Sequence, residues 1–89
     1  NDGNLIDAAE ALDHLATEAA QVGELPVQAL AMFNSAWLYG KAGRKAATAT
    51  RVARLESLLR SPYMPVAIRD RLSSWLKTSK ELAAAAEVS

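Results

Sequence analysis

Cysteine is absent from the 89 residues, and its absence excludes disulfides and thiolate zinc sites. Histidine occurs once, as His14. A serine–histidine triad would therefore have to use a side chain that lies in the middle of an acidic segment, away from any serine-bearing turn. A glycine-rich phosphate loop preceded by a strand is also missing. We therefore expect a protein that is not an enzyme.

The chain also has no excess of positive or negative charge, because ten Lys and Arg residues balance ten Asp and Glu residues. Dedicated nucleic-acid binders are commonly strongly basic, so the balance lowers the expectation of that function. The longest uncharged run, "LPVQALAMFNSAWLYG" at residues 25–40, includes Gln28, Asn34 and Ser35. A membrane span needs ~20 predominantly apolar residues. We expect no membrane segment.

The chain begins Asn1-Asp2-Gly3 without an initiator Met, and no basic start is followed by an apolar run. We expect a fragment or a processed piece of a longer protein, and we find no support for a secretory signal. The sequence leaves the compartment open, with the cytoplasm as the favoured expectation.

Glycine and proline are few, with four and three residues, and they fall where helices would end or begin. Ala and Leu are abundant and runs of Val, Ile and Thr are lacking, which favours helix over strand. Apolar residues recur at spacings of three and four within four segments, which are residues 5–22, 26–39, 45–60 and 65–85. The sequence predicts a single compact all-α domain of four mostly antiparallel helices, without strands.

Local signals support these boundaries. Asn4 suits the N-cap of the first helix, and Gly23 suits the residue after its end. Pro26 and Pro65 suit the first turn of the second and fourth helices. The segments "PVQALAMFNSAWL" and "PVAIRDRLSSWL" also resemble each other, which is compatible with a duplicated helical hairpin or with two common helix features.

Within residues 26–39 the strongest apolar stripe is formed by Val27, Leu30, Phe33 and Trp37. Because these residues share one helical face, we expect them to point toward the core. The predicted centre of the core consists of Leu30, Phe33, Trp37, Leu55, Leu59, Leu72 and Trp75.

The opposite side of the same helix carries a neutral line of Gln28, Met32, Ser35 and Tyr39. In a four-helix domain this line can be a second layer of the core, which is the favoured interpretation. Alternatively it is exposed and contacts another chain, because Tyr and Met are enriched at interfaces and charged residues are depleted there.

Tyr63 and Met64 lie in the turn "SPYMP". Large apolar residues in a loop can be exposed for a partner, or they can close the end of the helical bundle, and we weigh these two alternatives equally.

Asp7, Glu10, His14 and Glu18 share one face of the first helix, since they are spaced by three and four residues. Carboxylate-bridged metal bundles need matching ligands from other helices, and the later helices have no second histidine. We expect a solvated acidic face, with no metal and no other cofactor.

Charge is segregated along the chain. The charged residues within residues 1–24 are all acidic, whereas residues 41–60 contain six basic residues and one acidic residue. Together with the fourth helix they suggest a candidate basic strip of Lys41, Arg44, Lys45, Arg51, Arg54, Arg69, Lys77 and Lys80. The strip could bind a phosphate backbone or an anion at the start of the third helix. The favoured alternative is pairing with the acidic first helix, within the domain or between copies.

The sequence therefore predicts a non-catalytic protein–protein interaction or assembly module, which self-associates as a homo-oligomer or docks a partner helix. The residues predicted to contact the partner are Gln28, Met32, Tyr39, Tyr63 and Met64. A nucleic-acid or anion interface on the candidate basic strip is the alternative and ranks below protein contact.

Overall fold

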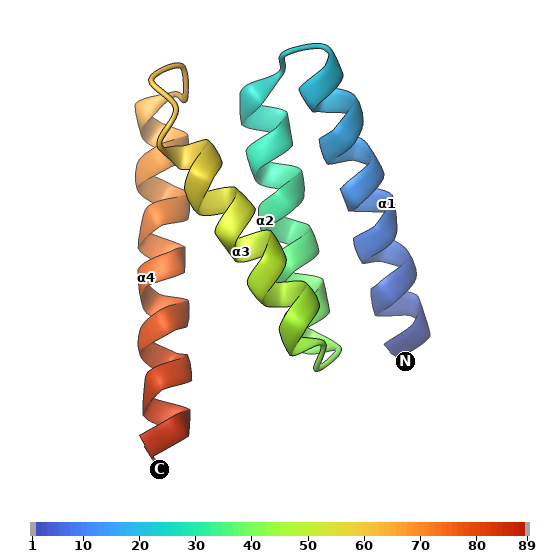
Figure 1. The fold of residues 1–89 in the computed structure, drawn as a ribbon, viewed down its shortest axis with the longest axis vertical. Coiled ribbons are helices and arrows are strands. Elements are labelled where there is room, and N and C mark those ends of the chain that lie inside the picture. The colour runs from blue at the N-terminus through green and yellow to red at the C-terminus, as the bar shows by residue number, and fades with distance from the viewer. Residues whose placement is uncertain (1, 89) are drawn as a thin grey trace.

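The computed structural model describes residues 2–88, with side chains described for residues 3–78. Four helices follow one another along the chain: α1 (Asp2–Gln21), α2 (Leu25–Lys41), α3 (Lys45–Leu59) and α4 (Val66–Val88). The described residues contain no strand (Figure 1). The predicted all-α class and the number of helices are confirmed.

The predicted helix ends are close to the observed ones, with two differences. α1 already begins at Asp2, so Asn4 lies inside the helix and is not its N-cap. α4 continues to Val88, three residues beyond the predicted end. Pro26 lies in the first turn of α2, where its missing N–H leaves no hydrogen bond unmade.

The turn after α1 and the turn after α2 have the same hydrogen-bond pattern. After α1, the Gly23 amide donates to the Ala20 carbonyl and the Glu24 amide donates to the Ala19 carbonyl at 2.9 Å. After α2, the amides of Gly43 and Arg44 repeat this pattern. Gly23 and Gly43 have φ values of 75° and 76°, as expected for glycines that end helices in a Schellman motif.

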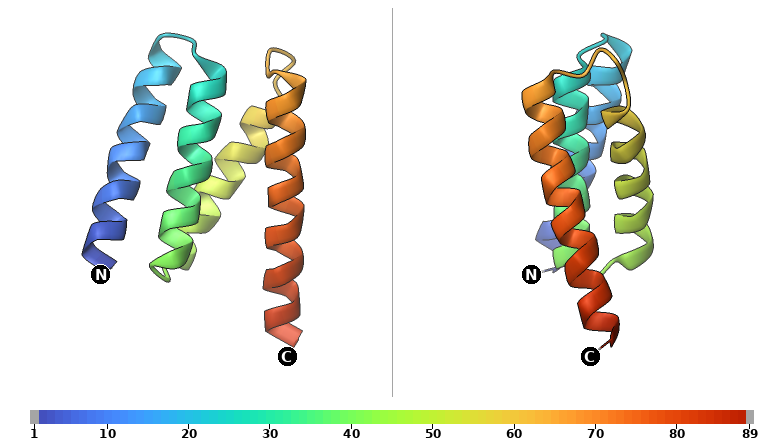
Figure 2. Two further views of the ribbon diagram at one scale, coloured as in Figure 1. Left: turned by 180° about the vertical axis from the view of Figure 1, so that it is seen from behind. Right: turned by 90° about the vertical axis from the view of Figure 1, so that its left-hand side faces the viewer.

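The helices form an open arrangement in which α2 is central. α1 and α2 lie side by side along their lengths, and α3 crosses α2 (Figure 1). α4 contacts α3 mainly near the turn that joins them, and its C-terminal half stands apart (Figure 2). The α1–α2 pair therefore packs more extensively than the α3–α4 pair, so the tertiary structure does not repeat between the two hairpins.

The core lies between α2, α3 and α4, and Ala16 of α1 packs against it. Its larger buried side chains are Met32, Leu55, Leu59, Met64, Leu72 and Leu76. This confirms the prediction for Leu55, Leu59 and Leu72. Phe33 and Trp75 are partly buried and pack against this core, with their rings edge to face at a centroid distance of 4.4 Å.

The prediction that Leu30 and Trp37 lie in the core is wrong, because they are 37% and 47% exposed. α2 instead turns Ala29, Ala31 and Ala36 inward, and all three are buried. Small side chains let neighbouring helices approach closely, so the interior face of α2 is its alanine-rich side. Val27, Leu30 and Trp37 are left on the outside.

The neutral line of α2 lies inside the molecule. Met32, Ser35 and Tyr39 are buried and Gln28 is partly buried. This confirms the favoured interpretation, in which the line is part of the core.

Candidate functional site

Asp13 of α1 is the centre of a polar network that joins three helices. Its carboxylate accepts a hydrogen bond from the Ser35 hydroxyl of α2 at 2.6 Å. It also accepts hydrogen bonds from Nε and Nη2 of Arg51 in α3, at 3.3 and 2.8 Å. The two Arg51 bonds form a bidentate ion pair, which is the stronger geometry for such pairs.

Arg51 makes further contacts within the domain. Its Nη1 donates to the Ala47 carbonyl at 3.1 Å, and its guanidinium lies over the Tyr39 ring at 4.4 Å from the centroid. The cation–π contact with Tyr39 and the ion pair with Asp13 both stabilise the positive charge of Arg51 within the domain. Arg51 is therefore engaged within the fold and is not available as a free cation.

The network shifts the pKa values of its members. Burial favours a raised pKa for Asp13, but the hydrogen bonds from Arg51 and Ser35 outweigh it and hold the pKa below its ordinary value of 3.8. Burial and the nearby Asp13 carboxylate raise the pKa of Tyr39. The hydrogen bond to Asp13 raises the pKa of Arg51. At neutral pH the pair is therefore ionic, and Tyr39 is protonated.

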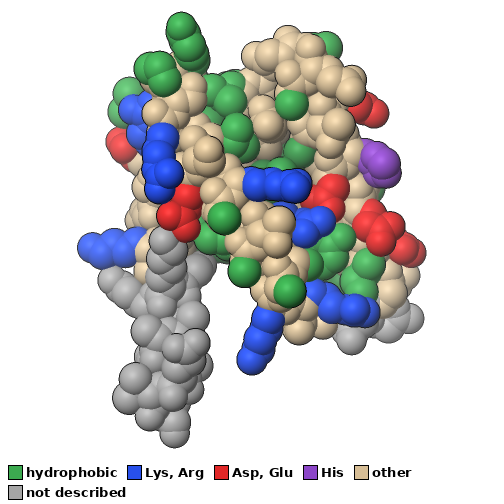
Figure 3. Space-filling model, viewed as in Figure 1, with side chains coloured by type: hydrophobic (Ala, Val, Ile, Leu, Met, Phe, Trp, Pro, Cys, Tyr) green, Lys and Arg blue, Asp and Glu red, His purple; other side chains and the backbone are tan. Residues whose placement is uncertain are grey.

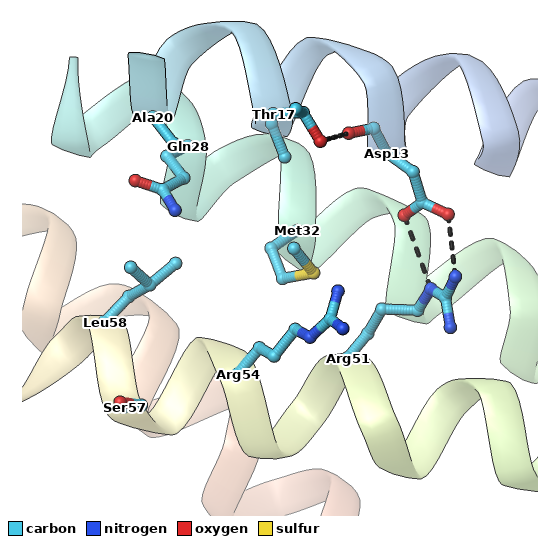
Figure 4. A pocket seen from close by; sticks show the side chains of 10 residues that line it. Asp13, Thr17, Ala20, Gln28, Met32, Arg51, Arg54, Ser57 and Leu58 are labelled. Atoms are coloured by element: carbon cyan, nitrogen blue, oxygen red, sulfur yellow. Dashed lines mark hydrogen bonds and ion pairs between the residues drawn. The ribbon is translucent and has the colours of Figure 1, made fainter. Parts of the chain in front are cut away.

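A pocket of about 440 Å³ lies next to this network. Its walls come from α1 and α3, and α2 forms its floor (Figure 4). Figure 4 shows the Arg54 side chain extending from α3 into the space between the helices, with Met32 on the floor beside it. The side chains that line the pocket belong to Asp13, Ala16, Thr17, Ala20, Gln28, Met32, Arg51, Arg54, Ser57 and Leu58.

On the opposite side of α2, three large apolar side chains are exposed to solvent. We name Val27, Leu30 and Trp37 the outer stripe; Val27 is 36% exposed. Their spacing of three and seven residues places them on one helical face. The ammonium of Lys41 lies 4.5 Å from the centroid of the Trp37 ring, at the end of the stripe. The sequence predicts that these three residues face the core together with Phe33, which is wrong for all three and holds only for Phe33.

α1 adds exposed apolar residues to the same hairpin. Leu15 and Val22 are exposed, and they are seven residues apart, so they share one side of α1. Leu15 is two residues from Thr17, which lines the pocket. Because two residues correspond to a rotation of about 200° around a helix, Leu15 points away from the pocket.

The structure separates the five residues predicted to contact a partner. Met32, Tyr39 and Met64 are buried within the chain, and Met32 lies on the floor of the pocket. Gln28 lines the pocket. Tyr63 is 86% exposed. In the "SPYMP" turn, Met64 therefore packs in the core and its neighbour Tyr63 faces solvent. Contact between Tyr63 and a partner stays a prediction.

The predicted basic strip is not one continuous surface. Besides Arg51, Arg69 is engaged internally, since it donates to the carbonyls of Leu59, Ser61 and Met64 at 3.0, 2.6 and 3.3 Å. Acidic side chains lie between basic ones on the face seen in Figure 3. Arg44, Lys45, Arg54 and Lys77 are exposed. The side chain of Lys80 lies outside the described residues.

Glu10, His14 and Glu18 are exposed on the outer side of α1. Among the residues described, no three His, Asp or Glu side chains come together in a way that could hold a metal ion. Across the described residues, each helix is too short or too polar to cross a membrane.

Comparison with known proteins finds no matching protein family, no similar curated protein and no similar solved structure. The candidate surfaces are therefore judged on their own geometry.

Proposed function

We propose that this chain is a non-catalytic assembly module that pairs with a second copy of itself through the outer stripe. The observation that carries the proposal is the exposure of Val27, Leu30 and Trp37 on one face of α2. The stripe has no charged residue between Val27 and Trp37. Aromatic residues are enriched at the centres of interfaces and charged residues are depleted there.

The distribution of charge favours a second copy as the occupant. The chain has a formal net charge of zero at pH 7, so two copies do not repel each other through their net charge. Glu18 and Glu24 lie near one end of the α1–α2 hairpin, and Lys41 and Arg44 lie near its other end.

A two-fold axis that reverses the direction of one hairpin would bring Glu18 and Glu24 of each copy toward Lys41 and Arg44 of the other. The apolar stripes would then meet at the centre, because a two-fold interface uses the same surface patch on both copies. Complementary charges at the rim of such an interface guide orientation more than they add affinity.

The test is the solution mass of the chain over a series of concentrations, measured by light scattering after size exclusion. We expect a dimer for the unmodified chain and a monomer for Trp37→Glu and for Leu30→Glu, since a buried unpaired charge opposes association. Helicity, measured by circular dichroism, should be unchanged because both side chains already contact solvent in the monomer.

Val66→Glu is the matched control, because Val66 is 64% exposed but belongs to α4 and not to the stripe on α2. This variant should remain a dimer. A monomeric unmodified chain at concentrations up to about 1 mM would contradict the proposal. A Trp37→Glu variant that still dimerises with unchanged affinity would place the interface elsewhere.

A further inference from the structure

We infer that the pocket between α1 and α3 binds a carboxylate with an apolar body, and that Arg54 is the counter-charge for this carboxylate. The inference is independent of the proposed self-assembly, because the outer stripe lies on the other side of α2.

The pocket contains two guanidinium groups and one carboxylate. The Asp13 carboxylate is engaged by the bidentate ion pair with Arg51 and by the hydrogen bond from Ser35. Arg54 makes no ion pair or hydrogen bond within the described part of the chain. Because Arg51 and Asp13 neutralise each other, Arg54 leaves the pocket with one uncompensated positive charge.

Two polar groups beside Arg54 are also available. Gln28 and Ser57 line the pocket, and their side chains make no hydrogen bond to other described residues. The Thr17 hydroxyl, by contrast, already donates to the Asp13 carbonyl at 3.1 Å. An anion at Arg54 could therefore also accept hydrogen bonds from the Gln28 amide and the Ser57 hydroxyl.

The rest of the lining is apolar and comes from Ala16, Ala20, Met32 and Leu58. Six of the ten lining residues are polar or charged, so the pocket can hold a polar head group beside an apolar body. Its volume of 440 Å³ falls in the ~300–1,000 Å³ range of ligand sites. Ala16 and Ala20 are one turn apart on α1, and their small side chains leave the space that a ligand would occupy.

The charge of the pocket selects the class of ligand. A single unpaired guanidinium matches the single negative charge of a carboxylate. A phosphate dianion would leave about one negative charge uncompensated next to Asp13, and like charges at close range repel. The carboxylate can come from a free aliphatic acid or from an Asp or Glu side chain of a peptide, since both present the same group.

The experiment is a titration of the isotopically labelled chain followed by amide chemical shifts. The first probe is octanoate, and 1-octanol is its uncharged counterpart. The second probe is an end-capped pentapeptide with one glutamate between leucines, and the same peptide with glutamine is its counterpart. We expect saturable shifts at Thr17, Ala20, Gln28 and Leu58 with at least one carboxylate probe, and weaker binding of its neutral counterpart.

Arg54→Gln should weaken the binding of the carboxylate probe by about tenfold or more, because a charge-assisted hydrogen bond is lost. Arg71→Gln is the control with the same loss of charge, since Arg71 is exposed on α4 and is not among the lining residues. It should leave the affinity unchanged. Both side chains are exposed, so neither replacement should unfold the chain.

Saturation by octanoate would identify a free acid as the ligand, and saturation by the peptide alone would identify a side chain of a partner. The inference is overturned if neither carboxylate saturates the pocket. It is also overturned if the neutral counterpart binds as tightly, or if Arg54→Gln and Arg71→Gln bind equally well.

Discussion

At the scale of single residues, Asp13 and Arg51 show how a charge pattern becomes a contact. In sequence Asp13 belongs to an acidic helix and Arg51 to a basic one, and pairing of such helices, within the domain or between copies, is the favoured interpretation of this charge segregation. The structure pairs them within the domain. It also adds Ser35 and Tyr39, whose participation is not visible from charge alone.

We expect Asp13→Asn to lower the free energy of unfolding by about 1–3 kcal/mol at pH 7, because Arg51 loses its partner in a partly buried site. Asp7→Asn is the control. Asp7 is exposed on the same helix, so its replacement should change stability by less than about 0.5 kcal/mol. Urea denaturation at one fixed protein concentration measures both, since self-association would make stability depend on concentration.

The stabilising effect of Asp13 should depend on pH in a defined direction. Its pKa in the folded chain lies below 3.8, so its contribution is complete above the unfolded value and is lost as the pH falls through the folded value. The difference in stability between the unmodified chain and Asp13→Asn should therefore shrink below about pH 4. A difference that stays constant from pH 7 down to pH 2 would contradict this assignment.

Arg69 shows the opposite outcome for a predicted site residue. It was assigned to an anion-binding strip, but its guanidinium donates to three carbonyls around the end of α3. The last carbonyls of a helix have no partner within the helix. Arg69 therefore supplies a side-chain cap from the next helix and fixes the turn between α3 and α4.

At the scale of elements, the two Schellman turns set the direction of the chain. We expect Gly23→Ala and Gly43→Ala each to destabilise the chain by about 1 kcal/mol, because an L-residue is strained at positive φ. A Cβ atom at either position would meet no other atom within 4 Å, so the loss comes from the backbone and not from a clash.

Gly40→Ala is the matched control with an effect of opposite sign. Gly40 lies inside α2, and a Cβ atom there would sit 3.8 Å from the Thr48 hydroxyl oxygen, which is ordinary contact. Alanine favours a helix over glycine by up to about 1 kcal/mol, so thermal denaturation should show a higher melting temperature. A melting temperature that falls for all three variants would show that contacts, and not backbone conformation, decide at these sites.

At the scale of the whole molecule, the cations do not form a continuous track for a phosphate backbone. Arg51 and Arg69 are engaged internally, and Lys41 lies over the Trp37 ring. Four predicted cations remain without such contacts in the described residues, namely Arg44, Lys45, Arg54 and Lys77.

We therefore expect weak binding to duplex DNA, with a plot of log affinity against log salt no steeper than about −4, since each phosphate contact contributes roughly −0.9. Fluorescence anisotropy of a labelled duplex at several salt concentrations measures this slope. A steeper slope, reduced by Arg44→Ala with Lys45→Ala, would restore nucleic-acid binding as the function.

The sequence by itself determined the helices and their connections, because helix periodicity, Gly23, Gly43 and the helix-starting prolines act over a few neighbouring residues. It did not determine which side of α2 is buried. Both sides of α2 lack charge between Leu25 and Gly40. A prediction from hydrophobicity alone therefore places the side with the larger apolar side chains, such as Leu30 and Trp37, in the core. Only the tertiary structure shows that the alanine-rich side of α2 is buried, because α1 and α3 can approach α2 closely only where its side chains are small. The same helix crossing placed Asp13 beside Arg51, 38 residues away in sequence, and left Arg54 facing an open pocket whose other walls come from α1 and α2.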